Sequence, residues 1–284
     1  MKKRVVLITG IILLAISVLI FIYPTASKLI NRINDDSLTY QYSNRVSAVS
    51  PEDKEEYLRQ AKKYNENLNN TVADVFSEDA FNVNPAYEDI LSFENGQIGV
   101  VEIPKINVKL PIYHGVSEDV LKNGAAHMAN TAFPIGGVNT NSVISAHTAY
   151  PGKVFFDELT ELDRGDTFSV NVLNDKLTYM VSDIWVVDPG DVSKLKIVPG
   201  KELITLVTCT PYAINSHRLI VRGERINSEI QTEPVTKEKS AGDKHSNNHI
   251  IALSILICTA AVAVWVIFRI RRKFREGKNN DKKS

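Results

Sequence analysis

Each end of the chain carries an uncharged apolar run that is flanked by basic residues. The first run covers residues 5–23 and follows a basic stretch at residues 2–4, and the second covers residues 250–268 and precedes the basic segment 269–275. Each run has about 19 residues, close to the roughly 20 that a helix needs to cross a bilayer. Basic residues next to a span stay on the cytoplasmic side. The pattern therefore predicts two membrane spans, with both termini in the cytoplasm and the residues between the spans outside the cell.

A cleavable signal peptide is the alternative interpretation of the first run, since signal peptides also begin with basic and then apolar residues. The run is longer than the usual apolar region of about 7–15 residues, and the sequence PTAS at residues 24–27 is a poor small-x-small cleavage site. We therefore expect an uncleaved anchor over residues 1–25. A second membrane helix is expected over residues 250–268, followed by a basic cytoplasmic tail over residues 269–284.

Between the apolar runs the pattern is first polar and then helical. Residues 26–50 are polar without a clear period and predict a stalk, with a continuation of the membrane helix as one possible form of it. Ser50 followed by Pro51 is typical of a helix N-cap and first position. Apolar side chains then recur at helical spacing up to about Asn69. Together these features predict a stalk with a helical and irregular extension over residues 26–94.

From about residue 95 onward the pattern is that of short strands. The strand-like segments are residues 98–103, 106–112, 142–145, 167–173, 177–187, 203–208 and 219–223. Glycine and proline turn signals separate them, and this arrangement favours an all-β barrel or sandwich. We expect a core domain over residues 95–226 with short helical patches. A linker rich in Glu, Lys, Ser and Asn follows over residues 227–249.

The charge and the motif content exclude several classes of function. The chain has 33 basic and 33 acidic side chains, whereas proteins that bind nucleic acid carry a clear basic excess. Its histidines are scattered and do not have the close spacing of metal ligands. The sequence has neither a glycine-rich phosphate loop nor a GxSxG nucleophile motif. We therefore expect no nucleic-acid partner, no metal and no cofactor.

The chain has two cysteines, Cys209 and Cys258. Cys258 lies in the middle of the second apolar run, so Cys209 is the single thiol expected in the extracellular domain. Secreted domains tend to use cysteines in pairs, and a leftover cysteine suggests a reactive thiol. A buried, inert cysteine is the alternative. Cys209 ends an apolar strand just before a proline turn, a position that holds a nucleophile firmly and opens it to substrate.

Two further side chains are candidates for the same site. Arg218 opens the next strand, and pairing of the two strands would make it a cross-strand neighbour of Cys209. An arginine beside a thiol favours the thiolate and can donate hydrogen bonds to an oxyanion, although a surface cation is the alternative. His147 follows another short apolar strand and precedes a loop, as Cys209 does, so the two form a candidate nucleophile and base.

The remaining histidines are weaker candidates for the base. His114 and His127 fit structural roles better. His217 is next to Arg218, and neighbouring side chains on a strand point to opposite faces. The other two histidines lie in the predicted linker.

The segment TLVTCTP at residues 205–211, followed by Arg218 in HRLIVRGER, resembles the TLxTC signature of the sortase family with its downstream arginine. The resemblance extends over residues 95–226 through IGVVEIPKINVKLPIYHG and VISAHT. The longer match TLVTCTPYAINSHRLIVRGERI, with the second membrane span and the N-terminal extension, is similar to class C sortases, the pilin polymerases. The fold that this implies is mainly β, a sortase-type closed β-barrel with short helices, an N-terminal helical and lid extension, and two terminal transmembrane helices.

This resemblance implies a cysteine transpeptidase with His147, Cys209 and Arg218 as its active triad. Such an enzyme cleaves an LPxTG-like sorting signal after Thr through a thioacyl intermediate and joins the acyl group to a lysine of another pilin subunit. His147 would act as general acid and then as base, and Arg218 would hold the peptide and its oxyanion. The implied partners are the membrane and pilin subunits that carry the signal and the acceptor lysine.

Class C sortases also carry a lid over the active site, built on an Asp-Pro-aromatic motif before the barrel. Asp74 and Phe76 are the favoured counterparts here, and Asp79 with Phe81 is the second choice. Neither pair has the proline, so the lid backbone is less fixed than in the family pattern. An ordinary loop with an aromatic anchor is the alternative.

Two other functions fit the same sequence. One is a sortase that anchors surface proteins to cell-wall peptide, which shares the chemistry but uses another acceptor. The other is a non-catalytic, membrane-tethered β adhesion or scaffold domain in which Cys209 is inert.

Overall fold

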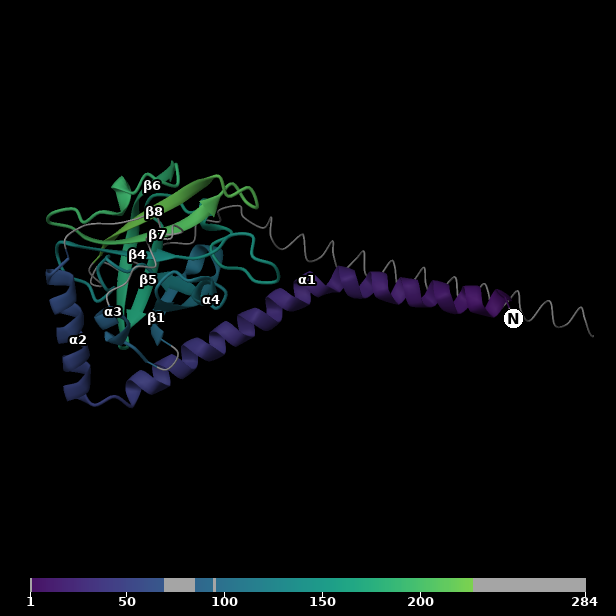
Figure 1. Cartoon of the computed structure of the whole chain (residues 1–284), viewed down its shortest axis with the longest axis horizontal. Coiled ribbons are helices and arrows are strands. Elements are labelled where there is room, and N and C mark those ends of the chain that lie inside the picture. The colour runs from purple at the N-terminus through teal and green to yellow at the C-terminus, as the bar shows by residue number, and fades with distance from the viewer. Residues whose placement is uncertain (1, 69–84, 94–95, 227–284) are drawn as a thin grey trace, which may run out of the picture. The chain divides into compact units, whose positions relative to one another are not determined.

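The computed structural model describes residues 2–68, 85–93 and 96–226 (Figure 1). The helices before the sheet are α1 (Lys2–Ser47), α2 (Pro51–Glu66) and α3 (Pro85–Asp89). The strands are β1 (Gln97–Ile103), β2 (Val108–His114), β3 (Ala125–His127), β4 (Thr140–Ser145), β5 (Thr167–Val172), β6 (Asp175–Val187), β7 (Glu202–Thr210) and β8 (His217–Arg225). The short helix α4 (Glu118–Leu121) lies between β2 and β3, and the 3-10 helices are η3 (Pro104–Ile106), η4 (Leu159–Glu161) and η5 (Ser193–Leu195).

In the part of the chain that the structure describes, the strands close into a barrel in the order β1-β2-β3-β4-β7-β8-β6-β5. The β2–β3 and β4–β7 pairs are parallel, and the other pairs are antiparallel. The β1–β5 pair closes the ring, with Val101 opposite Val170. Closure pairs both edges of the sheet. It confirms the barrel, and not the sandwich, among the two predicted all-β folds.

The barrel interior is filled by one apolar core to which every other side chain of the strands contributes. Phe168 and Tyr179 are among its largest buried side chains, and their rings stack with centroids 5.8 Å apart. Gly223 on β8 is needed beside them, because a Cβ at this position would lie 2.5 Å from the Phe168 ring. Burial of each large apolar side chain contributes about 1.5–3 kcal/mol, so the barrel is a firm frame for the residues at its strand ends.

A second apolar cluster lies on the opposite face of β4, β7 and β8. Its buried members, which we call the outer cluster, are Val116, Leu121, Ala126, Met128, Val143, Leu195, Val207 and Ile220. The neighbours of these residues along the strands, such as Ile144 and Leu206, belong to the interior core, as the alternation of side chains in a strand requires. The outer cluster holds α4 against the sheet through Leu121.

Two local features differ from the sequence prediction. The segment Pro104–Ile106 forms η3, so β2 begins at Val108 and not at residue 106. Pro104 suits the first position of a helical turn, and Asn107 ends it in the left-handed region with φ 54°. Strand β3 was not predicted, because its three residues give no periodic signal.

Helices α1 and α2 pack on the barrel through polar and aromatic contacts. The Tyr42 hydroxyl of α1 donates to the Ile98 carbonyl at 2.6 Å and accepts from the Leu173 N–H at 3.0 Å. Helix α2 begins as predicted, with the Ser50 hydroxyl accepting from the Asp53 N–H at 3.0 Å. The predicted stalk is helical as far as Ser47, because contacts with the barrel stabilise a segment that has little amphipathic pattern of its own.

Among the described residues, no helix combines the length and the apolar character that crossing a membrane requires. The linker over residues 227–249, the second predicted span and the basic tail lie outside the described residues.

Candidate active site

Cys209 and Arg218 are direct neighbours across the β7–β8 hairpin. Their Cα atoms are register partners, and Nη1 of Arg218 donates to the Cys209 sulfur at 3.6 Å. The six β7 residues that precede Cys209 are buried, whereas Cys209 and Arg218 are both partly exposed. The thiol therefore stands where a buried strand emerges at the surface, with a fixed positive charge beside it. This charge favours the thiolate, the reactive form of a cysteine.

His147 reaches the same end of the sheet on the other side of β7. Strand β4 runs parallel to β7, and Ser145 is the register partner of Val207. The Ala146 N–H then donates to the Val207 carbonyl at 3.2 Å, and the Thr208 hydroxyl donates to the Ala146 carbonyl at 2.8 Å. These bonds extend the pairing by one residue, so the backbone of His147, two residues after the end of β4, comes level with Cys209 on β7.

The three predicted residues also share one face of the sheet. Val143, Val207 and Ile220 belong to the outer cluster. Along each strand the same face recurs at every second residue, which puts Cys209 two residues after Val207 and Arg218 two residues before Ile220 on that face. The structure thus puts the thiol and the guanidinium in contact and brings the backbone of His147 to the neighbouring end of β4, beside the end of β7.

The loop after β4 holds the His147 ring from behind. The Tyr150 ring stacks on the imidazole with centroids 5.3 Å apart and an interplanar angle of 24°. The Phe156 N–H donates to the His147 carbonyl at 3.0 Å. The two oxygens of Asp157 accept from the Ala149 N–H at 3.0 Å and from the Phe155 N–H at 2.8 Å. This closed loop limits the motion of the imidazole.

One carboxylate of α4 also faces the imidazole. Oε2 of Glu118 lies 3.6 Å from Nε2 of His147. Sequence reasoning did not find Glu118, Tyr150 or Asp157 as parts of the site. The available signals were weak, because Glu118 is one of two adjacent acids after a helix N-cap, and the other two lie in a loop whose folding the sequence does not reveal.

The other candidate histidines are placed away from the reactive groups. His127 is buried, its Nε2 donates to the Ala132 carbonyl at 2.8 Å, and its Nδ1 accepts from the Tyr87 hydroxyl at 2.8 Å. Burial lowers the pKa of His127 to about 3. Burial also lowers the pKa of His114, against the opposing effect of two backbone carbonyls. Both histidines serve the packing of the barrel.

His217 lies at the start of β8 but is paired elsewhere. Its Nε2 lies 3.6 Å from the Asp188 carboxylate, and its Nδ1 is 2.8 Å from the Ser216 hydroxyl. The predicted lid pair, Asp74 and Phe76, and its alternative, Asp79 and Phe81, lie outside the described residues.

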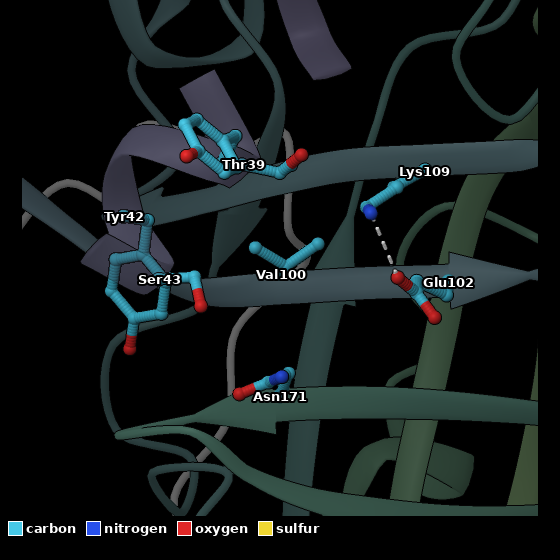
Figure 2. A pocket seen from close by; sticks show the side chains of 8 residues that line it. Thr39, Tyr42, Ser43, Val100, Glu102, Lys109 and Asn171 are labelled. Carbon is cyan, nitrogen blue, oxygen red and sulfur yellow. Dashed lines mark ion pairs between the residues drawn. The ribbon is translucent and has the colours of Figure 1, made fainter. Parts of the chain in front are cut away.

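A cavity of about 400 Å³ lies between α1 and the strands β1, β2 and β5. Figure 2 shows Thr39, Tyr42 and Ser43 on the helix side, with Glu102 and Lys109 forming an ion pair of 3.2 Å on the barrel side. Neither the triad residues nor the strands β4, β7 and β8 line this cavity. It is therefore separate from the candidate active site.

Comparison with known proteins identifies the family of this barrel. Residues 101–226 match the family described as the sortase domain. Among solved structures, the chain is similar to sortase C-1 from Streptococcus pneumoniae, with 39% identity and a TM-score of 0.64 over 67% of this chain and 98% of that one. It is also similar to the pilus-related sortase C of Group B Streptococcus, with 36% identity and a TM-score of 0.63 over the same shares of the two chains.

The chain is more distantly similar to curated relatives of other kinds. Sortase D from Bacillus subtilis (strain 168) is 32% identical over 137 residues, which make up 47% of this chain and 66% of that protein. The chain spans about half to two thirds of the length of the first curated relatives that it matches.

Proposed function

The chain belongs to the sortase family of transpeptidases, and we propose that it is a class C enzyme that polymerises pilins. It cleaves an LPxTG-like sorting signal after Thr and joins the acyl group to a lysine of another pilin subunit. The observation that carries this proposal is the contact of 3.6 Å between the Arg218 guanidinium and the Cys209 sulfur, on strands next to the end of β4, which His147 follows by two residues. An inert structural cysteine would need no such neighbours.

In the first half of the reaction, the Cys209 thiolate attacks the carbonyl carbon of the Thr residue and forms a C–S bond. The carbonyl oxygen becomes an oxyanion, to which the Arg218 guanidinium donates hydrogen bonds. The C–N bond to the following Gly then breaks, and the imidazolium of His147 gives its proton to the departing amine. The product is a thioester on Cys209 and a released peptide with a free N-terminus.

In the second half, the amine of a pilin lysine attacks the thioester carbon. His147, now neutral, takes the proton that the attacking nitrogen loses. The C–S bond breaks, an isopeptide bond has formed, and Cys209 returns to the thiolate. The same imidazole thus acts as acid and base in turn, and the loop that holds its ring limits the entropic cost of each proton transfer.

The pilin acceptor is supported by the class C character of the structural neighbours. The second apolar run and the extension before the barrel support it further. A sortase that uses a cell-wall peptide amine is the second candidate, because the triad chemistry is the same for both acceptors.

The proposed location is the cell membrane, with spans at residues 5–23 and 250–268 and both termini cytoplasmic. Its support is the basic residues beside each apolar run. In this arrangement the barrel lies outside the cell. A topology experiment with thiol-labelling sites at each end and in the barrel tests it, since labelling of the termini from outside would contradict it.

The function is tested by mixing the full chain in detergent with an LPxTG-type peptide and two competing amines. One amine is a pilin domain with its lysines intact, and the other is a cell-wall peptide. We expect a peptide–pilin conjugate, identified by mass spectrometry, that is lost when the pilin lysines are replaced by arginine. A conjugate with the cell-wall peptide alone would favour the anchoring sortase, and no conjugate with either would favour the scaffold.

A further inference from the structure

We propose that Glu118 is a positioning residue that stabilises the charged form of His147, and with it the thiolate of Cys209. This inference rests on the proposed function, because it concerns the same catalytic pair. It assigns a role to a residue that lies about 30 positions before His147 in the chain.

The position of Glu118 is fixed by the elements around it. Ser117 caps α4, with its hydroxyl accepting from the Val120 N–H at 3.3 Å. Leu121, one turn later, is buried in the outer cluster together with Val207. The cluster that anchors α4 is therefore the same one on which β7 carries Cys209. Because α4 and β7 pack on the same cluster, this cluster fixes the position of the Glu118 backbone relative to Cys209.

The geometry pairs an exposed carboxylate with a largely buried imidazole. Oε2 of Glu118 lies 3.6 Å from Nε2 of His147, and the two side chains are 74% and 18% exposed. The Tyr150 ring covers one face of the imidazole. Water therefore solvates a protonated His147 poorly, and a nearby negative charge has a correspondingly greater effect on it.

Other charged side chains belong to the elements that surround His147. Arg218 faces the site from β8, and Lys153 belongs to the loop after β4. Lys122 of α4 is paired with Asp119 at 2.5 Å, and its carbonyl accepts from the Lys153 amine at 2.5 Å. The Asp157 carboxylate accepts hydrogen bonds from the loop backbone. The Glu118 carboxylate, by contrast, lies within ion-pair distance of His147.

The chemical consequence follows from the proton exchange between Cys209 and His147. Below the pH at which the thiol ionises alone, the reactive state is the ion pair of thiolate and imidazolium. Glu118 favours the imidazolium, so it raises the population of this ion pair. Because the carboxylate is exposed, solvent screens it, and the expected effect is a change of about two- to five-fold in the population, not orders of magnitude.

Asp119 provides a matched control for Glu118. Both are acids in the first turn of α4, so both have the same effect on the helix end. Asp119 is 91% exposed and pairs with Lys122, not with His147. A substitution of Asp119 therefore reproduces the loss of charge and any effect on the helix, without the contact to the imidazole.

The test measures the rate at which iodoacetamide alkylates Cys209 in the full chain between pH 5 and pH 10. We expect Glu118→Gln to slow alkylation about two- to five-fold near pH 7 and to match the wild type above pH 9, where the thiol ionises without His147. Asp119→Asn should follow the wild-type curve throughout. Glu118→Asp, which keeps the charge but moves it back by one methylene, should lie between. If Glu118 had a purely structural role, the alkylation rates of Glu118→Gln and the wild type would not become equal at high pH.

Several results would overturn the inference. One is that the alkylation rates of Glu118→Gln and the wild type are equal at every pH. Another is that Glu118→Gln is alkylated faster, because the carboxylate would then mainly disfavour the thiolate of Cys209. Normal alkylation with slower transfer to an added amine would make Glu118 a contact for the acceptor instead. His147→Ala separates the two proposals: if it leaves alkylation near pH 7 unchanged, the catalytic pair itself is wrong.

Discussion

At the scale of single residues, the site depends on which positions end their strands. Cys209, His147 and Arg218 could be predicted because each follows or opens a short apolar strand, and such positions combine a rigid backbone with access to substrate. The structure puts Cys209 and Arg218 in contact and brings His147 to the neighbouring strand end, and the catalytic roles of the three stay predictions. Glu118 and Asp157 could not be predicted, because their contacts depend on how α4 and the loop after β4 fold back onto the site.

Replacement of Arg218 by lysine is predicted to lower the rate of peptide cleavage by about 10²–10³-fold, the usual loss for one oxyanion donor. Lysine keeps the charge but not the planar fork of donors that can serve both the sulfur and a carbonyl oxygen. Steady-state cleavage of a fluorescent LPxTG-type peptide measures the effect. Arg164→Lys, at an exposed arginine paired with Asp183, is the control and should retain full activity. Equal activity of Arg218→Lys and the wild type would contradict the role of Arg218 in holding the peptide and its oxyanion.

At the scale of elements, the sequence predicted most of the strands, and the resemblance to the sortase family predicted the closed barrel. The TLVTCTP and HRLIVRGER segments also predicted the sortase family correctly. It did not predict β3, which is too short for a pattern. Residues 26–47 continue helix α1, one of the possibilities that the sequence left open for the stalk. That helix is held by tertiary contacts such as the Tyr42 hydroxyl, which local sequence does not encode.

Tyr42→Phe is predicted to lower the free energy of unfolding by about 1–3 kcal/mol, because it leaves the buried Ile98 carbonyl and Leu173 N–H without their partner. Chemical denaturation monitored by circular dichroism measures the change. Tyr40, two residues earlier on α1, is 68% exposed. Tyr40→Phe is therefore the control and should change stability by less than about 0.5 kcal/mol. Similar values for the two variants would contradict the bridging role of Tyr42.

Asp157→Ala is predicted to loosen the loop that holds His147, since the carboxylate accepts from two backbone N–H groups. One of them belongs to Ala149, whose φ of 58° is unfavourable for a residue with a Cβ. We expect faster hydrogen exchange in residues 148–156 and about a tenfold loss in peptide cleavage, a size that we infer from misplacement of a catalytic group. Glu161→Gln, at an exposed acid in η4, is the control. Unchanged exchange in Asp157→Ala would show that the loop is held by other contacts.

At the scale of the whole molecule, the barrel and its site are described, but the parts that the sequence assigns to the membrane and to the lid stay predictions. Asp74 and Phe76 lie outside the described residues, as does the second apolar run. Membrane insertion depends on the surrounding lipid and on the flanking charges. A lid depends on contacts between the active site and the segment around Asp74, which lacks the proline of the family's motif. The stability of the described barrel, by contrast, follows from its own packing.

The stability of the molecule is predicted to fall as the pH falls from 6.5 toward 3. Burial holds the pKa of His127 at about 3 in the folded state, against 6.5 in the unfolded chain. Over this pH range His127 is therefore protonated in the unfolded state but not in the folded state. Burial lowers the pKa of His114 as well, so His114 contributes in the same direction. Thermal unfolding at several pH values measures the slope, and the interval from 6.5 to 5 separates the histidines from carboxylates. His217→Gln, at a half-exposed histidine, should retain the slope, and a flat profile would contradict the account.

The most direct measurement of the central claim is the intact mass of the full chain after incubation with an LPxTG-type peptide and no acceptor amine. The account predicts a mass increase equal to the peptide up to its Thr residue, located at Cys209 and removed by hydroxylamine. The adduct should be absent from Cys209→Ala and should not form in His147→Ala. A wild-type chain whose Cys209 reacts with iodoacetamide but never acquires the peptide, or continued cleavage by Cys209→Ala, would contradict the account.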